Sequence, residues 1–316
     1  MRILVTGACG YKGTVLVPKL LMAGHEVTAL DTMWFGNFLE KVSGDRKGLT
    51  VIKGDVRDSD LLDLSGYEAV IHLASIANDP CGDLNPKLTW EVSVLATMQL
   101  AEKASQAGVE RFIYASSGSV YGISEELNVT EDLPLLPLSE YNKTKMCAER
   151  VLLSYSDKMA IQIVRPATVC GISPRMRLDV SVNLLTMAAL ETQKITVFGG
   201  KQVRPNIHID DITDLYMFLL ARPDVTGVFN AGFENMSILE IAEAVAAVFP
   251  ADIVITPSED PRSYRLNSDK LLATGFMPKK TVADAVSEII AAYQSGSLKK
   301  EERFHNLKWM QAKGYA

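Results

Sequence analysis

Short apolar runs alternate along the chain with longer segments in which apolar residues recur at helical spacing. A run of about four to eight apolar residues is typical of a buried strand, and the longer period is typical of an amphipathic helix. We therefore expect strands at residues 2–5, 26–31, 49–53, 69–75, 111–116 and 160–164. Helices are expected between them, including one long helix at 84–107 that is closed by Gly108. This alternation, with short joins, predicts an α/β fold built on a parallel, doubly wound sheet.

The elements after residue 164 are shorter and their order is mixed, which indicates a change of architecture. We expect a first domain at residues 1–167 and a smaller α/β domain at 168–316, with an interleaved boundary. Amphipathic helices are expected near residues 211–221, 237–248 and 281–293. The charged tail from Lys299 is expected to be peripheral.

The first two predicted strands flank a glycine-rich turn at residues 6–13. Gly7 lets the chain turn sharply, Gly10 lets backbone approach a phosphate, and Gly13 lets the next helix lie close to the sheet. The N–H groups that begin this helix suit a pyrophosphate. Asp31 ends the second strand, where a carboxylate accepts a hydrogen bond from an adenosine ribose and repels a 2′-phosphate. The unit predicts a dinucleotide site that prefers NAD to NADP; the alternative is a glycine turn that binds no nucleotide.

Two further strand ends have the character of ligand sites. Asp55 and Val56 follow the strand at 49–53, at the carboxyl edge where open α/β sheets bind ligands. Asp55 can accept from an adenine amino group or cap a helix near 59–64, and these roles are compatible. The strand at 69–75 ends in small residues, which leave room for a ligand.

A serine cluster follows the fifth predicted strand, and a tyrosine and a lysine begin a later helix. Tyr141 and Lys145 are four residues apart, so they share one helix face. A cation beside a tyrosine stabilises the phenolate and lowers its pKa from about 10, which makes Tyr141 a usable acid or base for a hydroxyl proton. Ser117 can hydrogen-bond to the same substrate oxygen. Because a Y-x-x-x-K spacing is common by chance, the prediction depends on its order relative to the glycine turn and Asp31.

Composition and charge exclude several classes of function. The net charge is −6, which argues against general binding to nucleic acid or to a membrane surface, so any phosphate site must be a local cluster. The four cysteines and four histidines are dispersed without C-x-x-C spacing, so we expect reduced thiols and no metal. His208, in an alternating Ile-His-Ile run, is expected to be structural. No segment has the pattern of a signal peptide or membrane span, so we expect a cytoplasmic protein.

Taken together, the motifs resemble the extended short-chain dehydrogenases/reductases that act on nucleotide sugars, a family that includes UDP-glucose 4-epimerase. The resemblance covers nearly the whole chain. It is carried by Thr6-Gly7-x-x-Gly10-x-x-Gly13, Gly54-Asp55-Val56, His72-Leu73-Ala74, Ser116-Ser117-x-x-Val120-Tyr121-Gly122, Tyr141-x-x-x-Lys145, Arg165-Pro166 and Arg204-x-x-Ile207-His208-Ile209-x-Asp211. It implies a Rossmann-type fold, NAD as cofactor, a nucleotide-diphosphate sugar as substrate, and a homodimer formed through residues 84–107 and 139–157.

The resemblance also implies a role for each residue of the site. Tyr141 takes the proton of the sugar C4 hydroxyl while hydride passes to the nicotinamide, Lys145 holds the nicotinamide ribose and lowers the Tyr141 pKa, and Ser117 assists at O4. The expected NAD-binding residues are Gly7, Gly10, Tyr11, Lys12, Gly13, Asp31, Asp55, Val56, Leu73, Ala74, Ser75, Ser116, Tyr141, Lys145 and Pro166. The expected substrate-binding residues are Ser117, Ser119, Thr168, Arg177, Asn183, Arg204 and Arg262.

Three of these assignments have a specific basis in the family pattern. Arg204 stands at the place of the pyrophosphate-binding arginine, and Asn183 at that of a phosphate-contacting asparagine. Lys12 replaces an apolar residue in the glycine turn, and it either reaches the cofactor pyrophosphate or is solvated.

Departures from the family pattern narrow the reaction. The 4,6-dehydratases carry Asp-Glu directly after the catalytic Ser or Thr, where this chain has Gly118 and Ser119. The 3,5-epimerases have a Cys at the place of Ser119 and a His near Ser173, and this chain has neither. We therefore expect C4 epimerisation through a 4-keto intermediate. The alternatives are a C4 dehydrogenase or reductase, for example of a GDP-heptose in bacterial surface-polysaccharide synthesis, and a non-catalytic NAD-binding protein.

Overall fold

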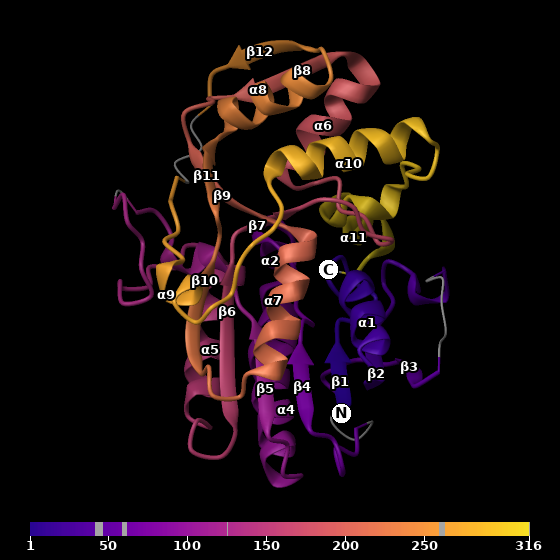
Figure 1. The fold of residues 1–316 in the computed structure, drawn as a ribbon, viewed down its shortest axis with the longest axis vertical. Helices are drawn as coiled ribbons and strands as arrows, with labels where there is room; N and C mark the ends of the chain where they lie inside the picture. The colour runs from indigo at the N-terminus through magenta and orange to yellow at the C-terminus, as the bar shows by residue number, and fades with distance from the viewer. Residues whose placement is uncertain (42–46, 59–61, 125, 259–262, 316) are drawn as a thin grey trace.

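A seven-stranded parallel sheet forms the base of the molecule (Figure 1). The computed structural model describes residues 1–41, 47–58, 62–124, 126–258 and 263–315. The strand order is β10-β6-β5-β4-β1-β2-β3. The strands are β1 (Arg2–Thr6), β2 (Glu26–Asp31), β3 (Leu49–Lys53), β4 (Ala69–His72), β5 (Arg111–Ala115), β6 (Ala160–Pro166) and β10 (Gly227–Ala231). The predicted doubly wound α/β fold is confirmed.

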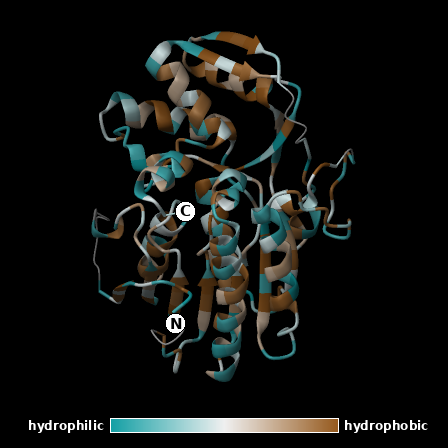
Figure 2. Cartoon of the chain, turned by 180° about the vertical axis from the view of Figure 1, so that it is seen from behind, coloured by the Kyte–Doolittle hydropathy of each residue, from teal (hydrophilic) through white to brown (hydrophobic). Residues whose placement is uncertain are grey.

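Helices cover both faces of this sheet, which explains why its central strands are almost continuously apolar. On one face α1 (Gly13–Met22) and α7 (Ile209–Ala221) pack together against alternate strand residues. On the other face α4 (Ala96–Gln106) and α5 (Glu140–Leu153) pack against the intervening strand residues. Figure 2 shows the hydrophobic strands enclosed between helices whose outer sides are hydrophilic.

A second layer lies over the carboxyl ends of the strands (Figure 1). It contains a three-stranded sheet, β11-β9-β7, and a two-stranded parallel sheet, β12-β8. Its strands are β7 (Thr168–Cys170), β8 (Lys194–Phe198), β9 (Val203–His208), β11 (Glu234–Ser237) and β12 (Asp252–Thr256). Its helices, which share a core of their own, are α6 (Ser181–Thr192), α8 (Ile238–Val248) and α10 (Val282–Gln294).

The second half of the chain also contributes to the large sheet. After β9 the chain descends through α7 and β10, and β10 pairs with β6 at the sheet edge. It then returns to the second layer through β11, which pairs with β9. The expected division at 167/168 remains a prediction, and residues 209–231 are one part of the second half that belongs spatially to the first.

The long helix predicted at 84–107 starts two residues later than expected. Residues 86–106 are helical throughout, as α3 (Pro86–Trp90), a π-helical stretch (Glu91–Leu95) and α4, while Leu84 ends a separate helix, α2 (Asp79–Leu84). Asn85 causes the break between α2 and α3, because its extended backbone ends α2 while its side chain accepts from the Leu88 amide and caps α3. Pro86 is well placed at the start of the new helix.

The tail is not peripheral. A short 3₁₀ helix (Glu302–Phe304) and α11 (Asn306–Lys313) return to the large sheet, where Phe304 and Met310 are buried. The other short elements are α9 (Asp269–Leu272) and 3₁₀ turns at Leu39–Lys41 and Gly118–Tyr121. Within the described ranges, no helix combines the length and apolar character needed to cross a membrane. The helix expected near 59–64 falls partly outside the described residues.

Candidate active site

The glycine turn fits a phosphate-binding cradle because side chains are excluded from it. Gly7 has a positive φ of 67°, and a Cβ there would lie 2.7 Å from the Ala74 amide nitrogen. A Cβ on Gly13 would lie 2.4 Å from the Ala8 carbonyl oxygen, so α1 approaches the turn as closely as predicted. The Lys12 side chain makes no capping hydrogen bond at the start of α1. The positive end of the helix dipole, at the N-terminus of α1, is therefore available to an anion.

Asp31 lies at the end of β2, beside the turn. Its carboxylate accepts the amides of Cys9 at 2.9 Å and Met33 at 2.7 Å. Burial raises the pKa of Asp31, and these two hydrogen bonds act in the opposite direction. Asp31 is thus fixed at the cavity wall, in the position that a ribose-binding carboxylate requires.

Asp55 holds a similar place at the end of β3. It accepts the Arg57 amide at 2.9 Å and forms an ion pair with the Arg57 guanidinium, also at 2.9 Å. Although burial opposes it, this pairing keeps the pKa of Asp55 below its ordinary value. Capping of the helix predicted near 59–64 lies outside the described residues.

One cavity of about 1060 Å³ brings the predicted residues together. It extends from the glycine turn, past the serine cluster, to β8 and β9 of the second layer. Its walls include nearly every predicted residue: Gly7, Gly10, Tyr11, Lys12, Gly13, Asp31, Asp55, Val56, Leu73, Ala74, Ser75, Ser116, Ser117, Ser119, Tyr141, Lys145, Pro166, Thr168, Arg177 and Arg204. Arg262 lies outside the described residues.

Asn183 does not line this cavity. It is fully buried, and its Oδ1 accepts the Gly171 amide at 3.1 Å. Its Nδ2 donates to the Tyr11 hydroxyl at 3.0 Å and to the Arg177 carbonyl at 2.8 Å. Both amide protons are therefore used inside the protein, and the geometry contradicts the expected phosphate contact. Asn183 instead fixes Tyr11 and the loop that carries Arg177.

Serine and tyrosine side chains form a hydrogen-bonded group at the centre of the cavity. Ser117 follows β5, and its hydroxyl lies 2.7 Å from that of Ser119. Ser119 in turn donates to the Asn142 side chain at 2.5 Å. Ser117 also hydrogen-bonds to Tyr141, which lies in the first turn of α5. Ser117 and Tyr141 are 24 residues apart in sequence, and they meet because α5 packs beside the 3₁₀ turn at Gly118–Tyr121.

Lys145 lies one turn after Tyr141, with its Nζ 5.8 Å from the Tyr141 ring centroid. It donates to the Ala115 carbonyl at 2.7 Å, and burial holds its pKa well below the ordinary value. Burial likewise raises the pKa of Tyr141 to about 12. The prediction that a neighbouring Lys145 gives Tyr141 a lowered pKa is therefore wrong for this structure. A hydrogen bond from Ser117 and the positive charge of Arg177 act to lower it.

A group of cations faces the same cavity. Arg177 is paired with Asp179, Nε to Oδ1, at 2.9 Å. Lys12 lies with its Nζ 3.4 Å from the Tyr216 hydroxyl, and burial, followed by the Arg177 charge, lowers its pKa to about 8. Lys12 is partly exposed in the cavity, and its contact with a cofactor pyrophosphate stays a prediction. Such a concentration of partly buried positive charge in an acidic protein suits phosphate groups.

Further residues line the cavity wall, and sequence reasoning missed those that α11 contributes. Arg175 is almost fully buried against Phe35, with its Cζ 4.1 Å from the ring centroid, and donates to Asn306 Oδ1 at 2.6 Å. Asn306 and Met310 reach the cavity from α11. The only sequence signal for α11 was a few apolar residues in a charged tail, which does not indicate where the tail docks.

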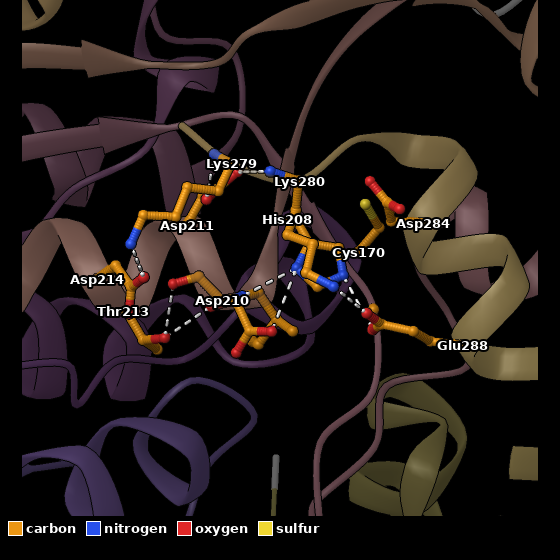
Figure 3. A network of polar contacts seen from close by, with 12 residues as sticks. Cys170, His208, Asp210, Asp211, Thr213, Asp214, Lys279, Lys280, Asp284 and Glu288 are labelled. Carbon is orange, nitrogen blue, oxygen red and sulfur yellow. Dashed lines mark hydrogen bonds and ion pairs between the residues drawn. The ribbon is translucent and has the colours of Figure 1, made fainter. Parts of the chain in front are cut away.

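His208 belongs to a separate polar network at the base of the second layer (Figure 3). His208, Asp210 and Glu288 lie close enough together to hold a metal ion. However, His208 Nδ1 accepts the Asp210 amide at 3.1 Å and so caps α7, while Nε2 lies 3.1 Å from Glu288. The charge of the Glu288 carboxylate is already paired with Lys280, whose Nζ lies 2.8 Å from Oε1. The arrangement ties α7 to α10, which is the structural role that the sequence indicated.

With this geometry established, comparison with known proteins identifies the family. Residues 3–232 match the sequence model of the NAD dependent epimerase/dehydratase family. The chain belongs to this family. It is 28% identical to the UDP-glucose 4-epimerase of Lactobacillus helveticus over 90% of this chain and 94% of that protein. It is 26% identical to the dTDP-glucose 4,6-dehydratase of Streptomyces niveus, over 93% of each chain.

Solved structures agree with this family assignment. MoeE5 in complex with UDP-glucose and NAD matches with a TM-score of 0.81 and 27% identity, over 94% of this chain and 100% of MoeE5. The UDP-glucose 4-epimerase of Thermus thermophilus, in complex with NAD, matches with a TM-score of 0.80 and 27% identity, over 92% of this chain and 100% of that protein. The predicted fold, family and NAD cofactor are confirmed at the level of the family.

Proposed function

We propose that this protein is a nucleotide-sugar 4-epimerase that keeps NAD as its cofactor. The observation that carries the proposal is the meeting of Ser117, Tyr141 and Lys145 on one cavity, between the glycine turn and the arginines of the second layer. UDP-glucose 4-epimerases among the relatives, and a neighbour bound to UDP-glucose, support a nucleotide-diphosphate sugar as substrate.

The chain's own residues suit reaction at a single sugar carbon. NAD, when bound, accepts hydride from the sugar C4 and returns it. Tyr141 takes the proton of the C4 hydroxyl and gives it back after the keto sugar has turned, so no net proton or hydride is lost. Ser117 holds the same oxygen. Burial raises the Tyr141 pKa to about 12 even though the Ser117 hydrogen bond and the Arg177 charge lower it, so without these two groups the phenol would be a still weaker acid.

Gly118 argues against the dehydration that some relatives perform. A Cβ at this position would lie 2.8 Å from Leu266 Cδ1 and 3.2 Å from the Pro166 carbonyl oxygen. An aspartate there would displace the tip of the Leu266 side chain and crowd the Pro166 carbonyl. The neighbouring Ser119 carries no charge, and its hydroxyl hydrogen-bonds to Ser117 and Asn142. Positions 118 and 119 thus supply neither the acid nor the base for elimination at C5 and C6.

The substrate's diphosphate is assigned to the second-layer end of the cavity. Arg204 on β9 lines this end together with Thr168, Gln202 and Phe198. A planar guanidinium offers paired donors to phosphate oxygens.

A homodimer remains part of the proposal, and the partly exposed Trp90, Leu95 and Met98 near α4 fit a contact there.

The decisive experiment incubates the purified protein with a panel of UDP-, GDP-, dTDP- and CDP-sugars. Products are followed by mass spectrometry and NMR, and NADH by absorbance. A product of unchanged mass without net NADH establishes an epimerase and names the substrate. A loss of about two mass units with accumulated NADH shows a C4 dehydrogenase, the main alternative. Loss of water shows that the protein performs dehydration without acids at 118 and 119.

A further inference from the structure

The last residues of the chain form part of the cofactor end of the cavity. The backbone enters this region at Phe304, whose carbonyl accepts the Leu178 amide at 2.9 Å. It continues as α11, whose Met310 joins the same buried cluster as Leu30 and Val56 of the large sheet. Asn306 and Met310 line the cavity with Asp31 and Asp55. A segment that the charge pattern placed at the periphery therefore covers the predicted adenosine site.

An aromatic contact fastens this segment to the loop that follows Asp31. The rings of Trp34 and Tyr315 stack with centroids 4.8 Å apart and an angle of 16° between planes. Trp309 Nε1 donates to the Trp34 carbonyl at 2.8 Å. Arg303 lies over the Phe38 ring, with its Cζ 4.4 Å from the centroid. Residues on both sides of the cavity rim are thus joined directly.

A buried cation links the two sides from below. Arg175 donates through Nη2 to Asn306 Oδ1 at 2.6 Å, and its guanidinium lies over the Phe35 ring. Asp179, which is paired with Arg177, also accepts the Asn306 amide at 3.1 Å. Arg175 Nε is buried and has no hydrogen-bond partner within the part of the chain that the structure describes. Arg175 thus joins the segment after β7 to the start of α11.

We propose that residues 301–315 are a clasp that closes the adenosine half of the NAD site, so that NAD exchanges only after the clasp undocks. The inference rests on the placement of NAD along the glycine turn and Asp31. It does not depend on which sugar reaction follows. The clasp makes its contacts through Trp309 and Tyr315 on one side and Asn306 on the other, and NAD lies beneath it.

The test measures how fast bound NAD exchanges with solution. Full-length protein saturated with NAD is mixed with excess isotope-labelled NAD, and the bound cofactor is released by denaturation at set times and quantified by mass spectrometry. The variants are Tyr315→Ala, Asn306→Ala and the double variant Trp309→Ala with Tyr315→Ala. Tyr315→Phe, which keeps the stacking ring, and Lys308→Ala, on the exposed face of α11, are matched controls.

We expect the double variant to exchange NAD about tenfold faster, because it removes both the aromatic stack and the hydrogen bond that hold the clasp to Trp34. Tyr315→Phe and Lys308→Ala are expected to exchange at the wild-type rate. Equal exchange rates in all variants, with unchanged thermal unfolding of the cofactor-free proteins, would overturn the clasp and leave the NAD site intact. Wild-type protein from which denaturation releases neither labelled nor unlabelled NAD would overturn the NAD placement and the clasp together.

Discussion

The two ends of the cavity are built differently. At the cofactor end, Tyr11 and Met310 are only 7% and 2% exposed, and backbone groups of a rigid turn define the wall. At the second-layer end, Leu184 and Phe198 are 45% and 60% exposed, and side chains define the wall. This difference is what we expect if one end retains a ligand and the other admits and releases one. Tyr141 and Ser117 lie where the two ends meet.

The largest effect is expected where the ends meet. Replacing Tyr141 with Phe removes the proton acceptor and keeps the ring, so we expect kcat to fall by about 100- to 10,000-fold. NAD binding, measured by calorimetry, should be nearly unchanged. Retained activity in this variant would show that proton transfer occurs elsewhere, and the role of Ser117 would then have to be reconsidered.

A change at the cofactor end should act through folding. Gly13→Ala places a Cβ 2.4 Å from the Ala8 carbonyl oxygen, so the free energy of unfolding should fall by about 3 kcal/mol. Gly24→Ala has open space around its Cβ and only the cost of a positive φ, about 1 kcal/mol. Denaturant titration of both variants separates the two costs. Equal losses would mean that α1 can move away from the turn.

A change at the second-layer end should act on substrate affinity. Arg204→Ala removes charge-assisted hydrogen bonds worth about 1.5–3 kcal/mol, so KM should rise by about 10- to 100-fold with little change in kcat. The matched control is Arg222→Ala, because the half-exposed Arg222 pairs with Asp224 away from the cavity. Steady-state kinetics on the substrate found in the panel checks this. A fall in kcat alone would place Arg204 at the reacting carbon.

The smallest effect concerns pH. Arg177 lowers the Tyr141 pKa, so Arg177→Gln should raise it, and the rising limb of the kcat/KM profile should move to higher pH. The rate at neutral pH falls about tenfold for each pKa unit gained. Two control variants separate the causes. Arg177→Lys keeps the positive charge, and Asp179→Asn removes the ion pair while Arg177 keeps its charge. If the limb stays in place in Arg177→Gln, Arg177 serves substrate binding only.

The sequence was most informative where function depends on local backbone geometry. The glycine turn, Asp31 and the serine cluster each stand at the end of a strand that the local sequence pattern predicts. All three line the one cavity. The direction of the Tyr141 pKa did not follow, because it depends on burial by residues far away in sequence. Asn183 was misassigned for a related reason: its buried partners, Tyr11 and Arg177, are not visible in a motif.

The order in which the chain is synthesised bears on how the predicted cofactor site is formed. The glycine turn is made before the residues that cover it, and the large sheet keeps an open edge at β6 until β10 has been made. The residues that cover the predicted cofactor site, Asn306 to Tyr315, follow both in sequence. The turn and the strands of the predicted site are therefore synthesised before α11 can dock over them. If the clasp slows exchange as proposed, cofactor that binds in this interval is retained.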